Sequence, residues 1–251
     1  MWSTTPCRSE MVPVGDVLAV GAVALGATMQ RATGLGFALV AAPFLVVILG
    51  PFSGVTLANL LSAVINLIVL SVTARTLRHR LAVQMIAGVI LALPLGVWVV
   101  RELPGPVLLV GIGMITAGSV AWVAMGQSMP FLRQRGGAVA SGFASGFCNT
   151  TAGTGGPPLA VYAVSTDWEH RSFVPTVQLV GLVTNVLSLA AKGPPVLSWR
   201  LLLACGAAML AGISGGHWLA RWLPETATRR WVLALALMGS VIAIAKGLSA
   251  W

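Results

Sequence analysis

Acidic side chains are scarce in this chain: its 251 residues include six Asp and Glu against fifteen Lys and Arg, and only 8% of all residues are charged. A soluble domain usually has about a quarter of its residues charged. Hydrophobic residues make up 57%, and the mean hydropathy is +0.91 over the whole chain. This composition excludes a sizeable soluble domain and predicts an integral membrane protein with nearly all of its residues in the lipid bilayer.

The few carboxylates avoid the middle of the apolar runs. They occur at the ends of runs, in loops or near the N-terminus: Glu10, Asp16, Glu102, Asp167, Glu169 and Glu225. This placement weakens a proton-coupled mechanism through a membrane carboxylate. An anion that leaves a cell with a negative interior gains about 2.3 kcal/mol per charge per 100 mV without any coupling ion. Export of an anion therefore fits the composition better than concentrative uptake.

Cysteine and histidine are also rare. The three cysteines are odd in number and too far apart for a metal motif, and the histidines form neither a metal pattern nor a catalytic triad with Ser and Asp. These residues are Cys7, Cys148, Cys205, His79, His170 and His217. A membrane-embedded enzyme would require a cluster such as paired His and carboxylate within the spans, and none is visible. We therefore predict no enzyme activity, metal or cofactor.

The net charge of +9 does not indicate a nucleic-acid partner, because the cations are spread thinly over the loops between apolar runs. Such cations are typical of cytoplasmic loops in membrane proteins. The apolar runs, such as residues 107–123 and 231–245, are continuous and lack the alternation of barrel strands, so helices are the spanning element. Residues 1–13 form a short polar lead without the apolar core of a signal peptide.

An internal repeat is visible at an offset of 120 residues. The pattern Gly96-x-Trp98-x-x-Arg101-x-Leu103-Pro104 recurs as Gly216-x-Trp218-x-x-Arg221-x-Leu223-Pro224. The same offset relates Arg80-Leu81 to Arg200-Leu201, and Gly26 and Gly36 to Gly146 and Gly156, while Asn66 and Asn185 correspond with a slip of one. We predict an all-α membrane protein of 8–10 transmembrane segments, built from two pseudo-symmetric repeats at residues 14–126 and 136–250.

Each repeat contains an apolar run that is interrupted by polar residues and glycine, at 26–37 and 146–158. Gly153, Gly155, Gly156, Pro157 and Pro158 all disfavour a continuous helix. Irregular backbone survives in a membrane only inside protein or beside a water-filled cavity. Paired interruptions in the two halves are typical of the substrate site of a secondary transporter, where helix N-termini offer donors to an anion. A close, glycine-rich helix crossing is the purely structural alternative.

We expect the two interruptions to face each other and to bind a small anion. The candidate residues come from both interruptions and from one polar position in a span of each half: Gln30, Arg31, Thr33, Gly34, Gly36, Asn66, Asn149, Thr150, Thr151, Thr154, Gly155, Gly156 and Asn185. The planar guanidinium of Arg31 suits the oxygens of sulfite, sulfonate or carboxylate. The alternative role for Arg31 is an interfacial arginine whose side chain extends to the lipid headgroups.

The topology follows from the length of the interrupted segments. Residues 16–49 are too many for one crossing of about 20 residues, so we expect each broken segment to cross twice or to enter and return, which makes the halves inverted. The arginine-rich loops, including 74–80 and 126–137, then lie in the cytoplasm and both termini lie outside. If each broken segment crosses once, the halves are parallel and the termini are inside. The distribution of charge does not distinguish these topologies.

The sequence resembles the sulfite exporter TauE/SafE family over residues 14–247. The resemblance is based on Gly34-Leu35-Gly36-Phe37 followed by Pro43, on Gly142-x-x-x-Gly146 leading into Gly153-Thr154-Gly155-Gly156-Pro157, and on the two-half plan. It implies transport of sulfite or a related organosulfonate across the bacterial inner membrane, with the bilayer and a small anion as partners. A channel and a permease for a small carboxylate without sulfur are the alternatives. A homodimer is compatible with the sequence, which does not define the oligomeric state.

Overall fold

A computed structural model of the chain describes residues 14–33, 36–126, 128–219 and 225–250. Within these ranges the structure contains helices and no strand. The ten α-helices are α1 (Val14–Thr33), α2 (Gly36–Leu49), α3 (Pro51–Thr73), α4 (His79–Glu102), α5 (Gly105–Met125), α6 (Gly137–Ala152), α7 (Gly156–Ser165), α8 (His170–Lys192), α9 (Trp199–Leu219) and α10 (Glu225–Ser249). Two short 3₁₀ helices, η1 (Ala74–Thr76) and η2 (Pro130–Arg133), precede α4 and α6.

Six of the described helices are long and apolar enough to cross a membrane. They include the whole of α4, α5 and α8, α3 together with η1, and most of α9 and α10. Large apolar side chains on these helices remain exposed, for example Ile90, Leu203 and Val241, whereas amides and hydroxyls such as Asn59, Asn149 and Thr184 are buried. Apolar residues outside and polar residues inside suit a protein surrounded by lipid. The predicted all-helical membrane protein is thus confirmed at this level.

The helices α1 and α2 fold back on each other. A β-carbon placed on Gly26 would lie 2.8 Å from Ala41 Cβ, and the N–H of Phe37 donates to Gln30 Oε1 at 2.9 Å. These contacts join the second half of α1 to the first half of α2, and a β-carbon on Gly15 would lie 3.8 Å from Ile48 Cγ2, so the two helices form an antiparallel hairpin. The predicted interruption was wrong at its start, because α1 continues past Gln30 to Thr33. Gln, Arg and Ala are good helix formers, so residues 30–32 extend the helix.

The helices α6 and α7 form a second antiparallel hairpin. Gly153 ends α6 with φ 74°, a left-handed conformation that glycine adopts without strain, and its N–H donates to Asn149 O at 2.8 Å. The chain then enters α7 with Pro157 in the first turn, where a missing N–H has little cost. Ser145 Oγ donates to Gly155 O at 2.6 Å and ties the two helices together near the turn.

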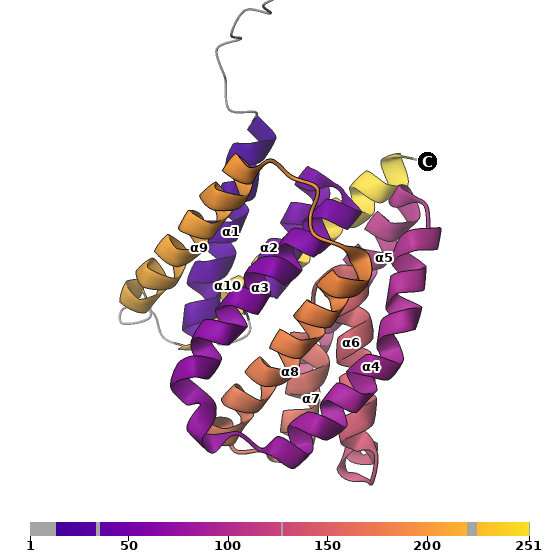
Figure 1. Ribbon diagram of the computed structural model, residues 1–251, viewed down its shortest axis with the longest axis vertical. Coiled ribbons are helices and arrows are strands. Elements are labelled where there is room, and N and C mark those ends of the chain that lie inside the picture. Colours follow the sequence, from indigo (N-terminus) through magenta and orange to yellow (C-terminus); the bar gives the residue numbers. More distant parts are fainter. Residues whose placement is uncertain (1–13, 34–35, 127, 220–224, 251) are drawn as a thin grey trace, which may run out of the picture.

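The hairpins pack on helices that are distant in the sequence. The α1–α2 hairpin lies against α9, and α6 lies against α4, while α3 pairs with α8 and α5 with α10 (Figure 1). Both hairpin contacts are close. A β-carbon on Gly142 of α6 would lie 2.0 Å from Met85 O, and one on Gly212 of α9 would lie 2.5 Å from Ala24 O. Small residues thus let the backbones of these helices touch.

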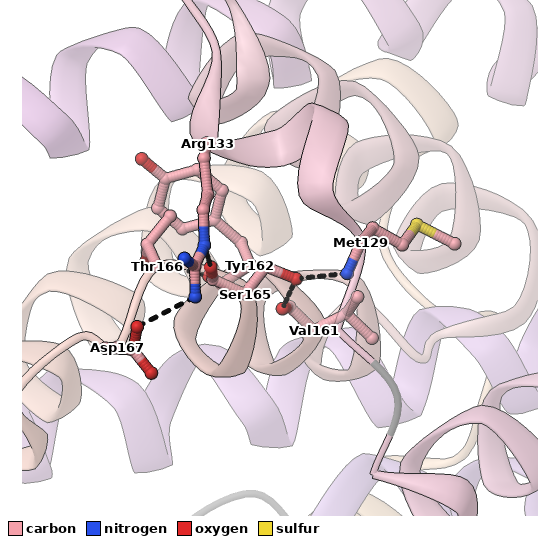
Figure 2. Close-up of polar contacts among 7 residues, drawn as sticks. All are labelled: Met129, Arg133, Val161, Tyr162, Ser165, Thr166 and Asp167. Carbon is pink, nitrogen blue, oxygen red and sulfur yellow. Dashed lines mark hydrogen bonds and ion pairs between the residues drawn. The ribbon is translucent and has the colours of Figure 1, made fainter.

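One end of the bundle gathers the arginine-rich loops. Thr76 Oγ1 donates to Arg171 O at 2.7 Å, which joins the segment after α3 to the start of α8. The connector between α5 and α6 meets the end of α7 through Arg133 and Asp167, which form a 2.8 Å ion pair (Figure 2). The described arginines in the loops and first helical turns at this end are Arg75, Arg78, Arg80, Arg133, Arg135 and Arg171. They belong to the group that the inverted topology assigns to the cytoplasm.

The opposite end of the bundle contains the start of α1 and the end of α10 (Figure 1). Here Arg101 Nη2 donates to Ala191 O at 2.7 Å, and Lys246 Nζ donates to Val47 O. Each cation therefore binds a carbonyl near the C-terminal end of a neighbouring helix, where the helix dipole favours positive charge.

Candidate functional site

A cavity of about 60 Å³ lies between the two hairpins and the paired helices α3 and α8. A single water needs roughly 10–15 Å³ by the same measure, so the cavity has room for a few waters or a small solute. Its lining combines amides, hydroxyls, glycines and apolar side chains, from Gln30, Phe37, Ala38, Ser62, Ile65, Asn66, Ser145, Asn149, Gly155, Gly156, Leu159, Val177, Gln178, Gly181, Thr184 and Asn185.

Both hairpins reach this cavity near their turns. Gln30 and Phe37 come from either side of the α1–α2 turn, and Asn149 and Gly155 come from either side of the α6–α7 turn. The two stretches that the sequence singled out, 120 residues apart, therefore lie at one cavity. Six predicted site residues line it: Gln30, Asn66, Asn149, Gly155, Gly156 and Asn185.

The helices α3 and α8 each present a polar stripe to the cavity. Ser62 and Asn66 are four residues apart on α3, and Gln178, Gly181 and Asn185 are spaced by three and four on α8. Residues at this spacing share one face of a helix. A β-carbon on Gly181 would lie 2.7 Å from Asn66 Nδ2, so the glycine leaves room for the Asn66 amide against α8.

Asn149 connects the second hairpin to this stripe. Its Nδ2 donates to Asn185 Oδ1 at 3.0 Å, and both side chains are buried. Asn149 Oδ1 and Ser62 Oγ, which belong to two of the lining residues, have no hydrogen-bond partner within the described structure. Buried polar atoms without partners are costly. The Ser62 hydroxyl can donate to an oxygen of a solute, whereas Asn149 Oδ1 can only accept a hydrogen bond, for example from water.

Gln30 is buried beside the turn of the first hairpin. Its Oε1 accepts the 2.9 Å hydrogen bond from Phe37 N, in the first turn of α2. The first N–H groups of a helix have no partner within the helix, so this side chain acts as a cap. The bond holds the amide group of Gln30 at the cavity wall and links its position to the geometry of the hairpin turn.

Three predicted site residues lie outside the described lining. Thr150 is buried against Gly96 of α4, because a β-carbon placed on Gly96 would lie 2.8 Å from Thr150 Cβ. Thr151 Oγ1 donates to Phe147 O at 2.7 Å. Thr154 is fully buried, and its Oγ1 has no partner in the described structure. Helix geometry explains the positions of Thr150 and Thr151, because each step along α6 turns by about 100° and carries them away from the face of Asn149. A binding role for these three residues stays a prediction.

Four more predicted residues surround the turn of the first hairpin. Arg31 and Thr33 belong to the last turns of α1, but their side chains lie outside the described part of the chain, and so does Gly34. Gly36 is the first residue of α2. Their role as anion ligands stays a prediction.

Several lining residues were missing from the predicted site. They are the polar or small residues Ser62, Ser145, Gln178, Gly181 and Thr184. Helical spacing from the predicted asparagines would have found most of them. Ser145 precedes Asn149 by four residues and Ser62 precedes Asn66 by four, while Gln178 precedes Asn185 by seven. Each pair therefore shares a helix face.

The described lining is polar but carries no ionisable side chain. Amide NH₂ groups and hydroxyls can donate hydrogen bonds to the oxygens of a small anion, and Ile65, Leu159 and Val177 supply apolar wall. Among the described residues, no group of His, Cys, Asp and Glu is arranged to hold a metal ion. The arrangement suits reversible binding of a small solute with several acceptor oxygens.

Comparison with known proteins supports a transport role. The family model described as sulfite exporter TauE/SafE matches residues 18–243, which is most of the chain. Neither the search of curated proteins nor the search of solved structures found a match. The chain belongs to the sulfite exporter TauE/SafE family, and it is a multi-pass membrane protein of a transporter family.

Proposed function

We propose that this protein is a secondary transporter that exports a small sulfur-containing anion, such as sulfite or an organosulfonate, across the bacterial inner membrane. The anion binds in the cavity between the two hairpins. The observation that carries the proposal is that cavity, which both hairpins reach near their turns and which is lined by neutral hydrogen-bonding groups. Membership of the family suggests sulfite-type anions as the substrate class.

Neutral donors suit a site that must release its ligand. A transported ion must be bound well enough to enter the site and weakly enough to leave it. The cavity offers side-chain amides from Asn66, Asn149, Gln178 and Asn185. These groups can replace part of the hydration of an anion without adding a fixed charge that would retain it. Arg31 follows Gln30 directly in α1 and is the proposed cationic ligand at the edge of this site.

The direction of transport follows from the charge of the substrate. The described lining includes no carboxylate that could carry a coupling proton. The membrane potential alone favours exit of an anion by about 2.3 kcal/mol per charge per 100 mV. Export down this gradient requires no coupling ion.

The proposed mechanism includes an inverted internal repeat. Helices α1–α5 and α6–α10 follow the same plan of a hairpin and three longer helices. The cross-packing is also reciprocal, since α1 packs on α9 and α6 packs on α4. A hairpin that enters and returns leaves three crossings in each half, so the second half begins on the opposite side of the membrane. Both features support inversion, and transporters of this kind bind substrate at the repeat interface.

Counterflow in proteoliposomes tests the proposed function. Vesicles loaded with unlabelled sulfite should accumulate labelled sulfite, and external sulfonates should compete. We expect Asn149→Ala and Asn185→Ala to lower the flux at least tenfold. The control is Thr116→Val, because Thr116 is buried in α5, bonds its own helix through Ile112 O and lies outside the described lining.

Three results would contradict the proposal. Wild-type flux of sulfite no greater than in empty vesicles would exclude this substrate. Competition by carboxylates but not by sulfonates would show that the substrate is a carboxylate and not a sulfur-containing anion. Currents far above the turnover of a carrier would indicate a channel.

A further inference from the structure

The polar stripe of α8 continues beyond the cavity. Gln178, Gly181 and Asn185 line the cavity, and the same spacing of three and four then reaches Ser188 and Lys192. These five positions share one face of the helix. Ser188 is fully buried, and Lys192 is only 7% exposed although it is the last residue of α8. A buried polar track therefore leads from the cavity to the end of the bundle away from the arginine-rich loops.

The ammonium of Lys192 has little compensation for its burial. Its Nζ donates to Thr150 O at 2.9 Å, and within the described residues this is its one hydrogen bond. The described structure contains a single salt bridge, between Arg133 and Asp167, so Lys192 has no carboxylate partner there. An ammonium carries three donors, and a buried charge without a counter-ion is unfavourable. The position is therefore suited to receive an anion.

The Lys192 contact is adjacent to the cavity. Thr150, which accepts the Lys192 hydrogen bond, directly follows Asn149 in α6. Asn149 donates to Asn185, the residue that precedes Ser188 in the α8 stripe. Side chains on a helix lean toward its N-terminus, so Lys192 extends back from the end of α8 in the direction of Asn185. The ammonium thus lies between the central cavity and the end of the bundle.

Unsatisfied polar atoms mark the same region. Asn59 Nδ2 donates to Ser188 Oγ at 3.0 Å, but Asn59 Oδ1 has no partner among the described atoms. Thr150 Oγ1 is buried against Gly96 of α4 and also lacks a described partner. Asn59 contacts the α8 stripe through its side chain, and Thr150 contacts it through its backbone carbonyl. Buried atoms of this kind often mark a water position that protein groups alone do not satisfy, and Asn59 Oδ1, which can only accept, would take its hydrogen bond from such a water and not from an anion.

We propose that Lys192 forms a second anion-binding position, on the route between the central cavity and the loop at 193–198. Its ligand is the same class of small oxyanion, sulfite or an organosulfonate, so this inference rests on the proposed function. The central cavity binds the anion with neutral amides, and Lys192 supplies the positive charge that draws it out of that cavity toward the end of α8.

A purely structural tie between α6 and α8 would not require burial of the charge. Lys246 illustrates the difference, because its Nζ also donates to a helix carbonyl, Val47 O, but from an exposed position. The chain thus contains two lysine-to-carbonyl contacts, one exposed and one buried beside the polar track. The exposed contact provides a matched control for the buried one.

The test compares sulfite transport by Lys192→Met, Lys192→Arg and Lys246→Met in proteoliposomes, after wild-type transport has been established. We expect Lys192→Met to raise the apparent KM for sulfite at least tenfold. Lys192→Arg keeps the charge and should stay within about threefold of wild type, and Lys246→Met within twofold. An unchanged KM for Lys192→Met would overturn the proposal, whereas absence of wild-type transport would instead overturn the proposed function.

A chemical rescue separates charge from packing, even if Lys192→Met folds poorly. Lys192→Cys is made in a chain whose Cys7, Cys148 and Cys205 are replaced by Ser. Its thiolate displaces bromide from 2-bromoethylamine, forming a thioether that carries an ammonium group and is stable to sulfite, and the excess reagent is washed away before the assay. We expect this ammonium to restore the KM for sulfite. Equal rescue by the neutral alkylating agent bromoethane, or no rescue by the ammonium, would overturn the proposal.

Discussion

Asn149 on α6 and Asn185 on α8 form a side-chain hydrogen bond of 3.0 Å at the wall of the cavity. This bond joins the C-terminal end of α6 to the C-terminal half of the membrane-spanning helix α8. Neither side chain is more than 5% exposed. The pair therefore couples the position of the hairpin to the geometry of the proposed binding site.

The energy of this bond can be measured with a double-mutant cycle. Side-chain hydrogen bonds between membrane helices contribute about 0.6–2 kcal/mol. We expect Asn149→Ala and Asn185→Ala each to lower the stability in detergent, and the double variant to lose about 1 kcal/mol less than the sum of the two. The free energy of unfolding is measured by denaturant titration. Strictly additive losses would show that the two amides do not interact.

Gly142 sets the closest approach of α4 and α6. A β-carbon there would lie 2.0 Å from Met85 O, so Gly142→Ala must push the helices apart. Overpacking of this kind typically costs about 1–3 kcal/mol. Because α6 also positions Ser145 and Asn149, we expect a lower melting temperature together with reduced sulfite transport. Gly118→Ala on α5 is the control, since a β-carbon at Gly118 has no described neighbour within 4 Å. We expect this variant to change the melting temperature and sulfite transport little.

Arg133 ties the connector between α5 and α6 to the end of α7. Its Nη2 pairs with Asp167, and its Nε donates to Ser165 O (Figure 2). The ion pair is solvent-exposed and should contribute less than about 1 kcal/mol. We therefore expect Asp167→Asn to have a small effect on thermal stability and Arg133→Ala a larger one, since the latter also leaves the Ser165 carbonyl without this donor.

Protease sensitivity of the connector provides a second measure of the same contact. Arg133→Ala should increase cleavage between η2 and α6, whereas Arg135→Ala, at an exposed position on the same connector, should not. Equal cleavage of the two variants would show that the Arg133 contacts do not hold the connector.

Labelling of single cysteines tests the inverted topology. Gln134, in the connector between η2 and α6, and Ser249, the last residue of α10, are both exposed. The start of α6 and the end of α10 lie at opposite ends of the bundle (Figure 1). In a chain without its native cysteines, we expect Gln134→Cys to react with a membrane-impermeant maleimide only from the cytoplasmic side and Ser249→Cys only from outside. The reactivity in intact cells is compared with that in inverted vesicles. Labelling of both positions from one side would contradict the proposed crossings, and labelling of Ser249→Cys only from inside would contradict the assigned orientation.

Much of the helical architecture could be predicted from the sequence. Lipid offers no partner for backbone N–H and C=O groups, so long apolar runs such as those of α5 and α8 must be helical. The asparagines at the cavity were also predictable, because a polar amide within an apolar span needs a buried partner or a water-filled site. The structure places Asn66 and Asn185 at the cavity wall, and their role in binding stays a prediction.

Other features depend on contacts that a single sequence does not display. Gln30 looked like the start of an interruption, yet it continues α1 and caps the next helix through Phe37 N. Thr150 and Thr151 looked equivalent to Asn149, but the helical rotation of α6 directs them away from the cavity. Apolar periodicity shows which face of α1 is buried and does not show that its neighbour is α9, about 190 residues later.

The cross-packing of the hairpins has a consequence for how the molecule comes apart. Because α1 touches α9 and α6 touches α4, each half of the chain surrounds elements of the other. Cutting the peptide bond between η2 and α6 would therefore give two fragments that remain associated. Any rearrangement that opens the cavity must move groups of helices drawn from both fragments, so the polypeptide link between them cannot act as the hinge.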